Sequence, residues 1–376
     1  MVNVKIVMGC FEVPGFGGAA TLNHELFAQL QERGEDISWI NLIPADRTEV
    51  FVRKFGSALG NPESRPRVHN IFLRHPPFGP QPDLAELICR EKPDVLVGCH
   101  FIAAKLFHQE GEGCPLVFIT AGFRWIQEVV PHRFRCATEA LEHLRLHGPT
   151  GLPPVPPAQD QAFRGANVCL VQAPVIKELY THFYPQVETK IAPQIKWEGG
   201  PKLKRARHFE NYVQEWGKRD IDLLFVASDW SRKIKNYGLA LEILARFPDR
   251  HCAVVGDLPD ELGPVAKWTQ HLGFVNSRDE IHRILGRSKV VVSPSSWDTA
   301  PGILYEATGM GCNIVCSQNC GNWEMCPESF LARDYTAEGF QAGIARALEG
   351  HVPICTQDFE TDCVSLILQT AASLCD

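Results

Sequence analysis

The sequence predicts an α/β protein of two doubly wound domains, and three observations support that prediction. Short apolar runs alternate with amphipathic helical segments, which is the rhythm of parallel β-α-β units. The length of 376 residues fits two domains of ordinary size. A proline-rich break and a basic stretch interrupt the alternation before a second series of strands and helices begins.

The first series starts with an apolar strand at 4–8. The helix expected at 19–33 places Leu22, Leu26 and Leu30 on one face, and Gly34 ends it. Residues 147–157 hold five prolines and two glycines, so we expect a loop there. Further strands are expected at 37–41, 70–73, 95–99, 116–120 and 166–171, and helices at 84–91, 103–108 and 173–182.

A basic stretch at 196–207 precedes the second series, and we expect the passage between the domains there. The expected domains are therefore 1–195 and 196–355, followed by a terminal helical segment at 356–376. In the second series we expect strands at 221–227, 252–256, 290–294 and 313–316, and helices at 237–247, 279–285, 303–310 and 337–348.

The composition limits the class of protein. A net charge of -7 and a pI near 6.1 argue against a nucleic-acid partner, which favours a basic face. No uninterrupted apolar run reaches the roughly 18 residues that a membrane-spanning helix requires. The first residues are expected to form a core strand and not a signal peptide, so we expect a cytoplasmic protein.

The sequence contains fourteen cysteines, most of them single residues in apolar runs. In a reducing compartment such residues behave as small core side chains. A local group, Cys312, Cys316, Cys320 and Cys326, leaves a metal or iron–sulfur site open. Its spacings include no C-x-x-C pair, and core packing is therefore the favoured interpretation, with no metal site expected.

The strongest chemical signal lies between the strands expected at 290–294 and 313–316. Asp298 follows the first strand, and Glu306 follows eight residues later on a helix. Backbone groups at a helix N-terminus bind anions, so this turn could hold a diphosphate, while Asp298 accepts hydrogen bonds from sugar hydroxyls and Glu306 from ribose. The candidate donor-binding turn comprises Thr299, Ala300, Pro301, Gly302 and Ile303.

The run Trp297–Val315 resembles the E-x7-E region of retaining GT-B glycosyltransferases, specifically glycosyltransferase family 4. Asp298 is one methylene shorter than the glutamate of that pattern, and Asn313 stands where proline is usual. The resemblance implies a GT-B fold, in which two Rossmann-like domains face a central cleft. It further implies an acceptor domain at 1–195, a donor domain at 196–355 and a final helix that packs back on the first domain.

Cations follow the strand expected at 221–227. Arg232, Lys233 and Lys235 would lie at the carboxyl end of that strand, where they could neutralise a leaving diphosphate. In the resembled family an arginine and a lysine of this segment do so, and Lys235 matches better than Arg232. A solvated basic turn is the alternative.

Two features of the first domain could reach the same ligand. Gly17 and Gly18 lie in a glycine-rich turn after the first strand, which the resemblance would place near the donor phosphates. The turn lacks G-x-G-x-x-G spacing and no acid ends the second strand, which disfavours a nicotinamide enzyme. His100 follows the strand at 95–99, where the family has a histidine near the reacting sugar; a capping or core histidine is the alternative.

The sequence therefore predicts a glycosyltransferase that moves a sugar from a nucleoside-diphosphate sugar to a small-molecule or glycan acceptor. The resemblance implies retention of configuration, and we expect the nucleotide sugar as co-substrate with no further cofactor. Arg124 and Arg133 are candidate contacts for an anionic acceptor, although both also fit a surface role. A sugar-nucleotide epimerase, a hydrolase and a non-catalytic nucleotide-sugar-binding protein are the alternatives.

Overall fold

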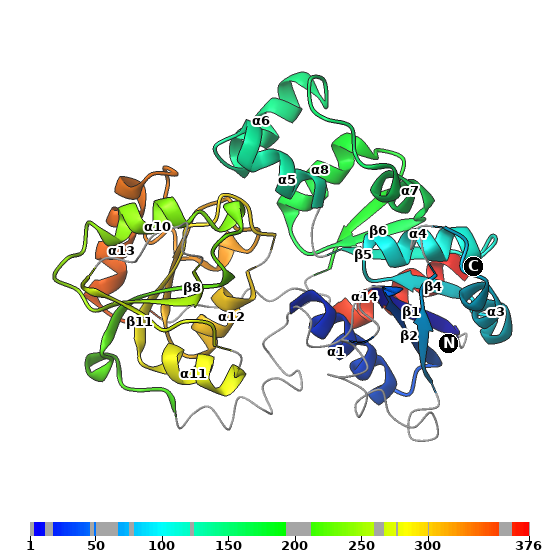
Figure 1. Ribbon diagram of the computed structural model, residues 1–376, viewed down its shortest axis with the longest axis horizontal. Helices are drawn as coiled ribbons and strands as arrows, with labels where there is room; N and C mark the ends of the chain where they lie inside the picture. Colours follow the sequence, from blue (N-terminus) through cyan, green and yellow to red (C-terminus); the bar gives the residue numbers. More distant parts are fainter. Residues whose placement is uncertain are drawn as a thin grey trace. The chain divides into compact units, whose positions relative to one another are not determined.

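The chain forms two compact units, each built around one parallel sheet (Figure 1). Unit 1 comprises Met1–Phe123, Gly151–Gln194 and Phe359–Asp376, and unit 2 comprises Arg124–Thr150 and Ile195–Asp358. The predicted α/β architecture with two parallel sheets is confirmed. The computed structural model describes residues 4–11, 18–45, 49, 67–74, 79–120, 124–192, 212–258, 267–275, 277–299, 301–352 and 363–375.

The sheet of unit 1 has seven strands in the order β3-β2-β1-β4-β5-β6-β7, all parallel. The strand order reverses between β1 and β4, because β1 pairs with β2 on one side and with β4 on the other. The strands are β1 (Ile6–Phe11), β2 (Ile37–Ile43), β3 (Val68–Phe72), β4 (Val95–Gly98), β5 (Leu116–Thr120), β6 (Val168–Val171) and β7 (Glu188–Ile191).

Helices cover both faces of this sheet. On one face, the last helix of the chain shares a buried core with α1, in which Leu26 and Ile367 lie. On the other face the ring of Phe118 packs 5.2 Å from that of Phe163 on α7. The helices of unit 1 are α1 (Gly18–Glu32), α3 (Pro82–Glu91), α4 (Phe101–Glu110), α7 (Pro157–Gly165), α8 (Pro174–Phe183) and α14 (Cys363–Cys375).

The sheet of unit 2 has five parallel strands in the order β10-β9-β8-β11-β12. Its order reverses between β8 and β11. The strands are β8 (Ile221–Asp229), β9 (Cys252–Asp257), β10 (Thr269–His271), β11 (Ser288–Ser293) and β12 (Asn313–Cys316). The helices are α5 (Arg124–Arg133), α6 (Ala137–His147), α10 (Tyr237–Leu244), α11 (Arg278–Gly286), α12 (Gly302–Gly309) and α13 (Ala337–Glu349).

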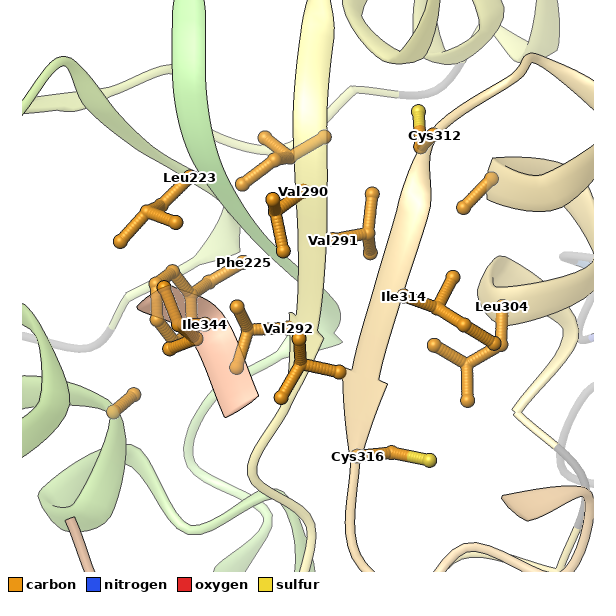
Figure 2. Close-up of a cluster of buried hydrophobic side chains, with 14 of the residues drawn as sticks. Leu223, Phe225, Val290, Val291, Val292, Leu304, Cys312, Ile314, Cys316 and Ile344 are labelled. Carbon is orange, nitrogen blue, oxygen red and sulfur yellow. The ribbon is translucent and has the colours of Figure 1, made fainter. Parts of the chain in front are cut away.

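Side chains alternate between the two faces of the sheet along each strand of unit 2, so its hydrophobic core lies on both sides of the sheet. Figure 2 shows Phe225 and Val292 on the side of Ile344 from α13, while Ile314 faces Leu304 from α12. The register explains this arrangement, since Val292 pairs with Phe225 in neighbouring strands and side chains of paired residues share a face. The buried β-branched run of β11 therefore needs helices on both sides.

Residues 124–150 pack with unit 2, although their place in the sequence put them in the expected first domain at 1–195. The reason is that the start of α6 bonds to the loops of unit 2: the Ala137 amide donates to the Ser296 carbonyl at 3.0 Å. The expected boundaries at 195/196 and 355/356 lie outside the described residues.

Some elements were not predicted because their sequences lack the periodic apolar signal. β7 and β10 are edge strands, and each carries polar residues where a central strand would be apolar. Helices α5 and α6 were also absent from the prediction. Among the helices that the structure describes, none combines the length and the apolar character needed to cross a membrane.

A charged cluster lies at the amino-terminal edge of the first sheet. Glu91 accepts a hydrogen bond from Ser38 at 3.2 Å and pairs with Lys5 at 3.3 Å and with His69 at 3.5 Å. Burial lowers the pKa of His69 below 6.5, although the Glu91 charge opposes the shift. Ligands of parallel sheets bind at the opposite, carboxyl edge, so we assign this cluster to stability.

The lowered pKa of His69 predicts an acid-sensitive step in stability. A group whose folded pKa is depressed stabilises the fold above its unfolded pKa, here 6.5, and that contribution is lost as the pH falls through the folded value. His69→Gln should therefore flatten the fall in Tm between about pH 7 and pH 5. The exposed His132 offers a matched control, and an equal effect of His132→Gln would contradict the assignment.

Candidate functional site

The candidate site lies at the point where strand order reverses in unit 2. β8 and β11 are neighbours, and the chain leaves them toward opposite sides of the sheet. Because parallel strands end at the same edge, the loops after β8 and β11 meet at their carboxyl ends, where open α/β sheets bind ligands. Lys235 follows β8, and Asp298 follows β11.

The loop after β8 is held by local geometry. A short 3-10 turn, Lys233–Lys235, ends at Asn236, whose φ of 53° is left-handed and is tolerated best by glycine, asparagine and aspartate. The Asn236 side chain accepts from the Leu239 amide at 3.3 Å and so caps α10. It also donates to the Tyr335 hydroxyl at 2.8 Å.

The loop after β11 bonds directly to this turn. The Ser296 amide donates to the Ile234 carbonyl at 2.9 Å, and the Tyr335 hydroxyl donates to the Pro294 carbonyl at 2.7 Å. Tyr335 therefore links both loops, and burial raises the pKa of its hydroxyl above the ordinary range. The two loops are fixed relative to each other before any ligand binds.

Lys235 and Asp298 form an ion pair between these two loops. Their side chains are 18% and 17% exposed, so the pair is partly withdrawn from water but still reachable. An ion pair in such a position interacts more strongly than one on an open surface. Two of the predicted site residues, 63 positions apart, therefore meet in the structure.

The turn after Asp298 leads into helix α12, and the helix N-terminus carries partial positive charge. Pro301 precedes the helix without a side-chain cap, and it has no amide hydrogen to offer an anion. Gly302 and Ile303 form the first turn and are half-buried, and Glu306 is half-buried further along the helix. Ala300 lies outside the described residues.

Thr299, another predicted donor contact, is buried at 3% exposure. Its hydroxyl finds no hydrogen-bond partner among the residues that the structure describes. A buried hydroxyl without a partner is costly, by about 1–3 kcal/mol, so Thr299 marks a position that a ligand or a water could satisfy.

In unit 1, His100 occupies the corresponding end of β4. Its Nδ1 accepts from the Ile102 amide at 3.2 Å and caps α4, and its ring stacks on Phe11 from the end of β1. Gly98 allows α4 to lie close to the end of β4, because a Cβ there would lie 2.6 Å from the Ala104 Cα. The capping alternative is thus realised, and in the neutral ring the proton is carried by Nε2.

No side-chain contact that the structure describes joins the remaining predicted residues to the ion pair, although the Arg232 carbonyl accepts from the Lys235 amide at 2.8 Å. Arg232 is exposed at the start of the 3-10 turn, and Arg133 is exposed on α5. Arg124 begins α5 and Gly18 begins α1, but the surroundings of the Arg124 side chain and of Gly18 lie outside what the structure describes. Gly17 lies outside it entirely.

Sequence reasoning missed Asn236, Tyr335, Asn319 and Thr138, which hold the loops of the site. Tyr335 contacts Asn236 across 99 positions, and Thr138 contacts Asn319 across 181. No local spacing signals such contacts, because the partners become neighbours only when the sheet forms.

The cysteine group near β12 is buried. Hydrogen bonding to the Cys320 and Cys326 thiols, together with burial, raises the pKa of Cys316 well above its ordinary value. A raised pKa favours the neutral thiol of Cys316, which fits a side chain packed in the core. In the ranges covered by the structure, no three His, Cys, Asp or Glu residues are arranged to hold a metal ion.

Asn313 stands where the resembled pattern usually has a proline, and its hydrogen bonds give a structural reason for an asparagine at this position. It is fully buried, and its side-chain amide donates to the Ala347 and Gly350 carbonyls at 2.7 and 2.8 Å. Its side-chain oxygen accepts from the Val352 amide at 3.1 Å. Asn313 thus joins the start of β12 to the end of α13.

Comparisons with known proteins find a family and several solved structures that this chain resembles. Residues 220–350, which contain the ion pair and α12, match the family described as glycosyl transferases group 1. No curated protein matches the sequence.

Solved structures match the whole chain at low sequence identity. HepE from Anabaena in complex with UDP is 15% identical over 98% of this chain and 99% of its own, with a TM-score of 0.55. The lipopolysaccharide outer core galactosyltransferase WaaB is 13% identical over 98% and 99%, with a TM-score of 0.62. The UDP-GlcNAc 2-epimerase from Methanocaldococcus jannaschii is 12% identical over 98% and 99%, with a TM-score of 0.53. The chain shares the GT-B fold of these structures.

Replacing Asn313 tests its structural role. Asn313→Ala should lower the free energy of unfolding by about 1–3 kcal/mol, because buried carbonyls of Ala347 and Gly350 lose their donor. Urea denaturation followed by circular dichroism measures this loss. Asn313→Asp keeps the acceptor for Val352 but not the donors, so it should also destabilise; full stability of both variants would refute the role.

Proposed function

We propose that this protein is a glycosyltransferase that moves a sugar from a nucleoside-diphosphate sugar to an acceptor hydroxyl or similar nucleophile. The observation that carries the proposal is the Lys235–Asp298 ion pair at the strand-order reversal of unit 2, on the loop that leads into the N-terminus of α12. In this arrangement the cation and the helix N-terminus fit the diphosphate of such a donor, and the carboxylate fits the hydroxyls of its sugar.

The diphosphate is the part that requires positive charge. Lys235 is the principal cation, Arg232 is a second one from the same turn, and the first amides of α12 add a helix dipole. Asp298 would accept from sugar hydroxyls, and Glu306 from the ribose. The complexes of HepE with UDP and with UDP-glucose support a uridine nucleotide as the first donor to test.

In the transfer step, the bond between the anomeric carbon and the diphosphate oxygen breaks, the acceptor oxygen forms the new bond, and the acceptor proton passes to the departing diphosphate oxygen. The electron pair of the broken bond stays on the diphosphate, where Lys235 and the α12 N-terminus stabilise the added charge. Retention of configuration, by attack on the same face as the departing diphosphate, is our proposal from the resemblance of Trp297–Val315.

His100 has one defined role in this scheme. Because its Nδ1 caps α4, the neutral ring can only donate from Nε2. We therefore favour a hydrogen bond from His100 to a donor-sugar hydroxyl over uptake of the acceptor proton. Arg124 and Arg133 on α5 remain candidates for an anionic acceptor, which we expect to be a small molecule or glycan in the cytoplasm.

A nucleotide-sugar epimerase is the second candidate, because the UDP-GlcNAc 2-epimerase shares this fold. The two activities differ in what happens without an acceptor. An epimerase converts its nucleotide sugar alone, whereas a transferase needs an acceptor for rapid release of the nucleotide.

The test of function follows from that difference. Incubated with UDP-sugars and a panel of sugar and glycan acceptors, the protein should release UDP in proportion to glycosylated product, as measured by mass spectrometry. Without acceptor, UDP release should be slow and the donor sugar unchanged. An epimerised donor would support the second candidate, and binding of the donor without turnover on any acceptor would point to a non-catalytic protein.

The two halves of the ion pair should have separable roles. Lys235→Met should weaken UDP binding about tenfold or more, because a charge-assisted contact to phosphate is lost. Asp298→Asn should leave UDP binding intact or tighter, since Lys235 is released from its partner, while kcat falls about 100-fold. Isothermal titration calorimetry and steady-state kinetics measure the two effects. Lys233→Met, exposed on the same turn, is the control, and equal losses in both lysine variants would refute the assignment.

A further inference from the structure

Helix α6 begins without a cap of its own. Its N-cap residue, Cys136, makes no side-chain hydrogen bond to the helix. The first amides of any helix lack partners within the helix and must find them elsewhere. Here the loops of the candidate site supply them: the Ala137 amide donates to the Ser296 carbonyl at 3.0 Å, and the Thr138 amide donates to the Asn319 side-chain oxygen at 3.1 Å.

Asn319 is the centre of this attachment. Its side-chain oxygen also accepts from the Thr138 hydroxyl at 3.2 Å. The NH2 group of the Asn319 side chain donates to the Ser317 hydroxyl oxygen at 3.0 Å, and the Asn319 backbone amide donates to the same oxygen at 3.3 Å. Because the NH2 group is bound to Ser317, the side-chain oxygen of the same amide faces Thr138. Asn319 is 3% exposed, so its bonds are protected from competition by water.

The backbone of Asn319 reaches Asp298 directly. The Asp298 amide donates to the Asn319 carbonyl at 3.0 Å, and the Gly321 amide donates to the Asp298 carbonyl at 2.8 Å. Asp298 and Cys320 thereby form an isolated parallel bridge beyond the ends of β11 and β12. The backbone that carries the site carboxylate is therefore held on both sides by the turn that α6 fastens.

We propose that Asn319 and Thr138 are positioning residues that hold Asp298 for contact with the donor sugar, an inference that rests on the proposed function. Neither side chain needs to touch the ligand. The Thr138–Asn319 contact fixes the 317–321 turn, the turn fixes the Asp298 backbone, and the backbone sets the carboxylate. A segment from the middle of the chain, residues 124–150, thus becomes part of the donor site's support.

Hydrogen exchange tests the attachment without any ligand. In Asn319→Ala, the peptide containing Asp298 should exchange about three to ten times faster than in the wild-type protein, because a buried anchor is lost. Thr138→Val, which removes only the hydroxyl at an exposed position, should show a smaller increase. Thr181→Val is the matched control, since that exposed hydroxyl donates to the Lys177 carbonyl of its own helix at 2.9 Å, away from the Asp298 loop in the sequence. Unchanged exchange in Asn319→Ala would overturn the proposal.

Calorimetry with UDP and UDP-glucose then separates positioning from general stability. If Asp298 is displaced, UDP-glucose should bind about three to ten times more weakly to Asn319→Ala while UDP binds as in the wild-type protein. Asn319→Asp keeps the acceptor oxygen for Thr138 but loses the donor to Ser317, so it should restore the ratio only in part. Equal weakening of both probes, or no change in either, would show a merely structural role and overturn the proposal. If the wild-type protein binds neither probe, the proposed donor fails, while the exchange result still decides whether Asn319 holds the Asp298 loop.

Discussion

The pairing of β8 with β11 is the constraint on which the candidate site depends. Parallel strands end at the same edge, and the reversal of strand order at this pair sends the two following chains to opposite sides. The helices that follow β8 and β11 therefore leave the carboxyl ends of these two strands open. Lys235 and Asp298 occupy that place, and the ion pair between them is a consequence of the strand order.

The loops at this edge are held by several long-range bonds and not by one. Tyr335 joins Asn236 to Pro294, and Ser296 joins the β11 loop to Ile234. A group that must meet a developing charge gains from such support, because the arrangement is made before the ligand arrives. The half-buried ion pair therefore lies on a backbone that these hydrogen bonds hold in place.

Residues 124–150 show how a two-unit chain can share its parts. The segment follows β5 of unit 1 in the sequence, yet its helices pack with unit 2. Its attachment uses two backbone amides of a helix start, which any sequence would possess. The Ser296 carbonyl accepts from one of them, and the side chain of the buried Asn319 accepts from the other. The sequence of α6 itself therefore gives little indication of where the helix packs.

Much of the fold could be predicted from local pattern. β5 and β12 begin and end where the apolar runs predicted, because buried parallel strands are continuous apolar runs. β10 could not be predicted, because its three residues, Thr269–His271, include no apolar run. The roles proposed for Glu306, Arg124 and Arg133 stay predictions.

The sequence by itself determined the two parallel α/β sheets and the order of the residues that carry charge along the second one. It did so because helix and strand periods and the positions of acids and bases are local properties of the chain. Only the tertiary structure decided that Lys235 pairs with Asp298, that His100 caps α4 through Nδ1, and that Thr138 reaches Asn319. Those contacts join residues that are distant in sequence or depend on one rotamer, and burial in the folded chain selects them.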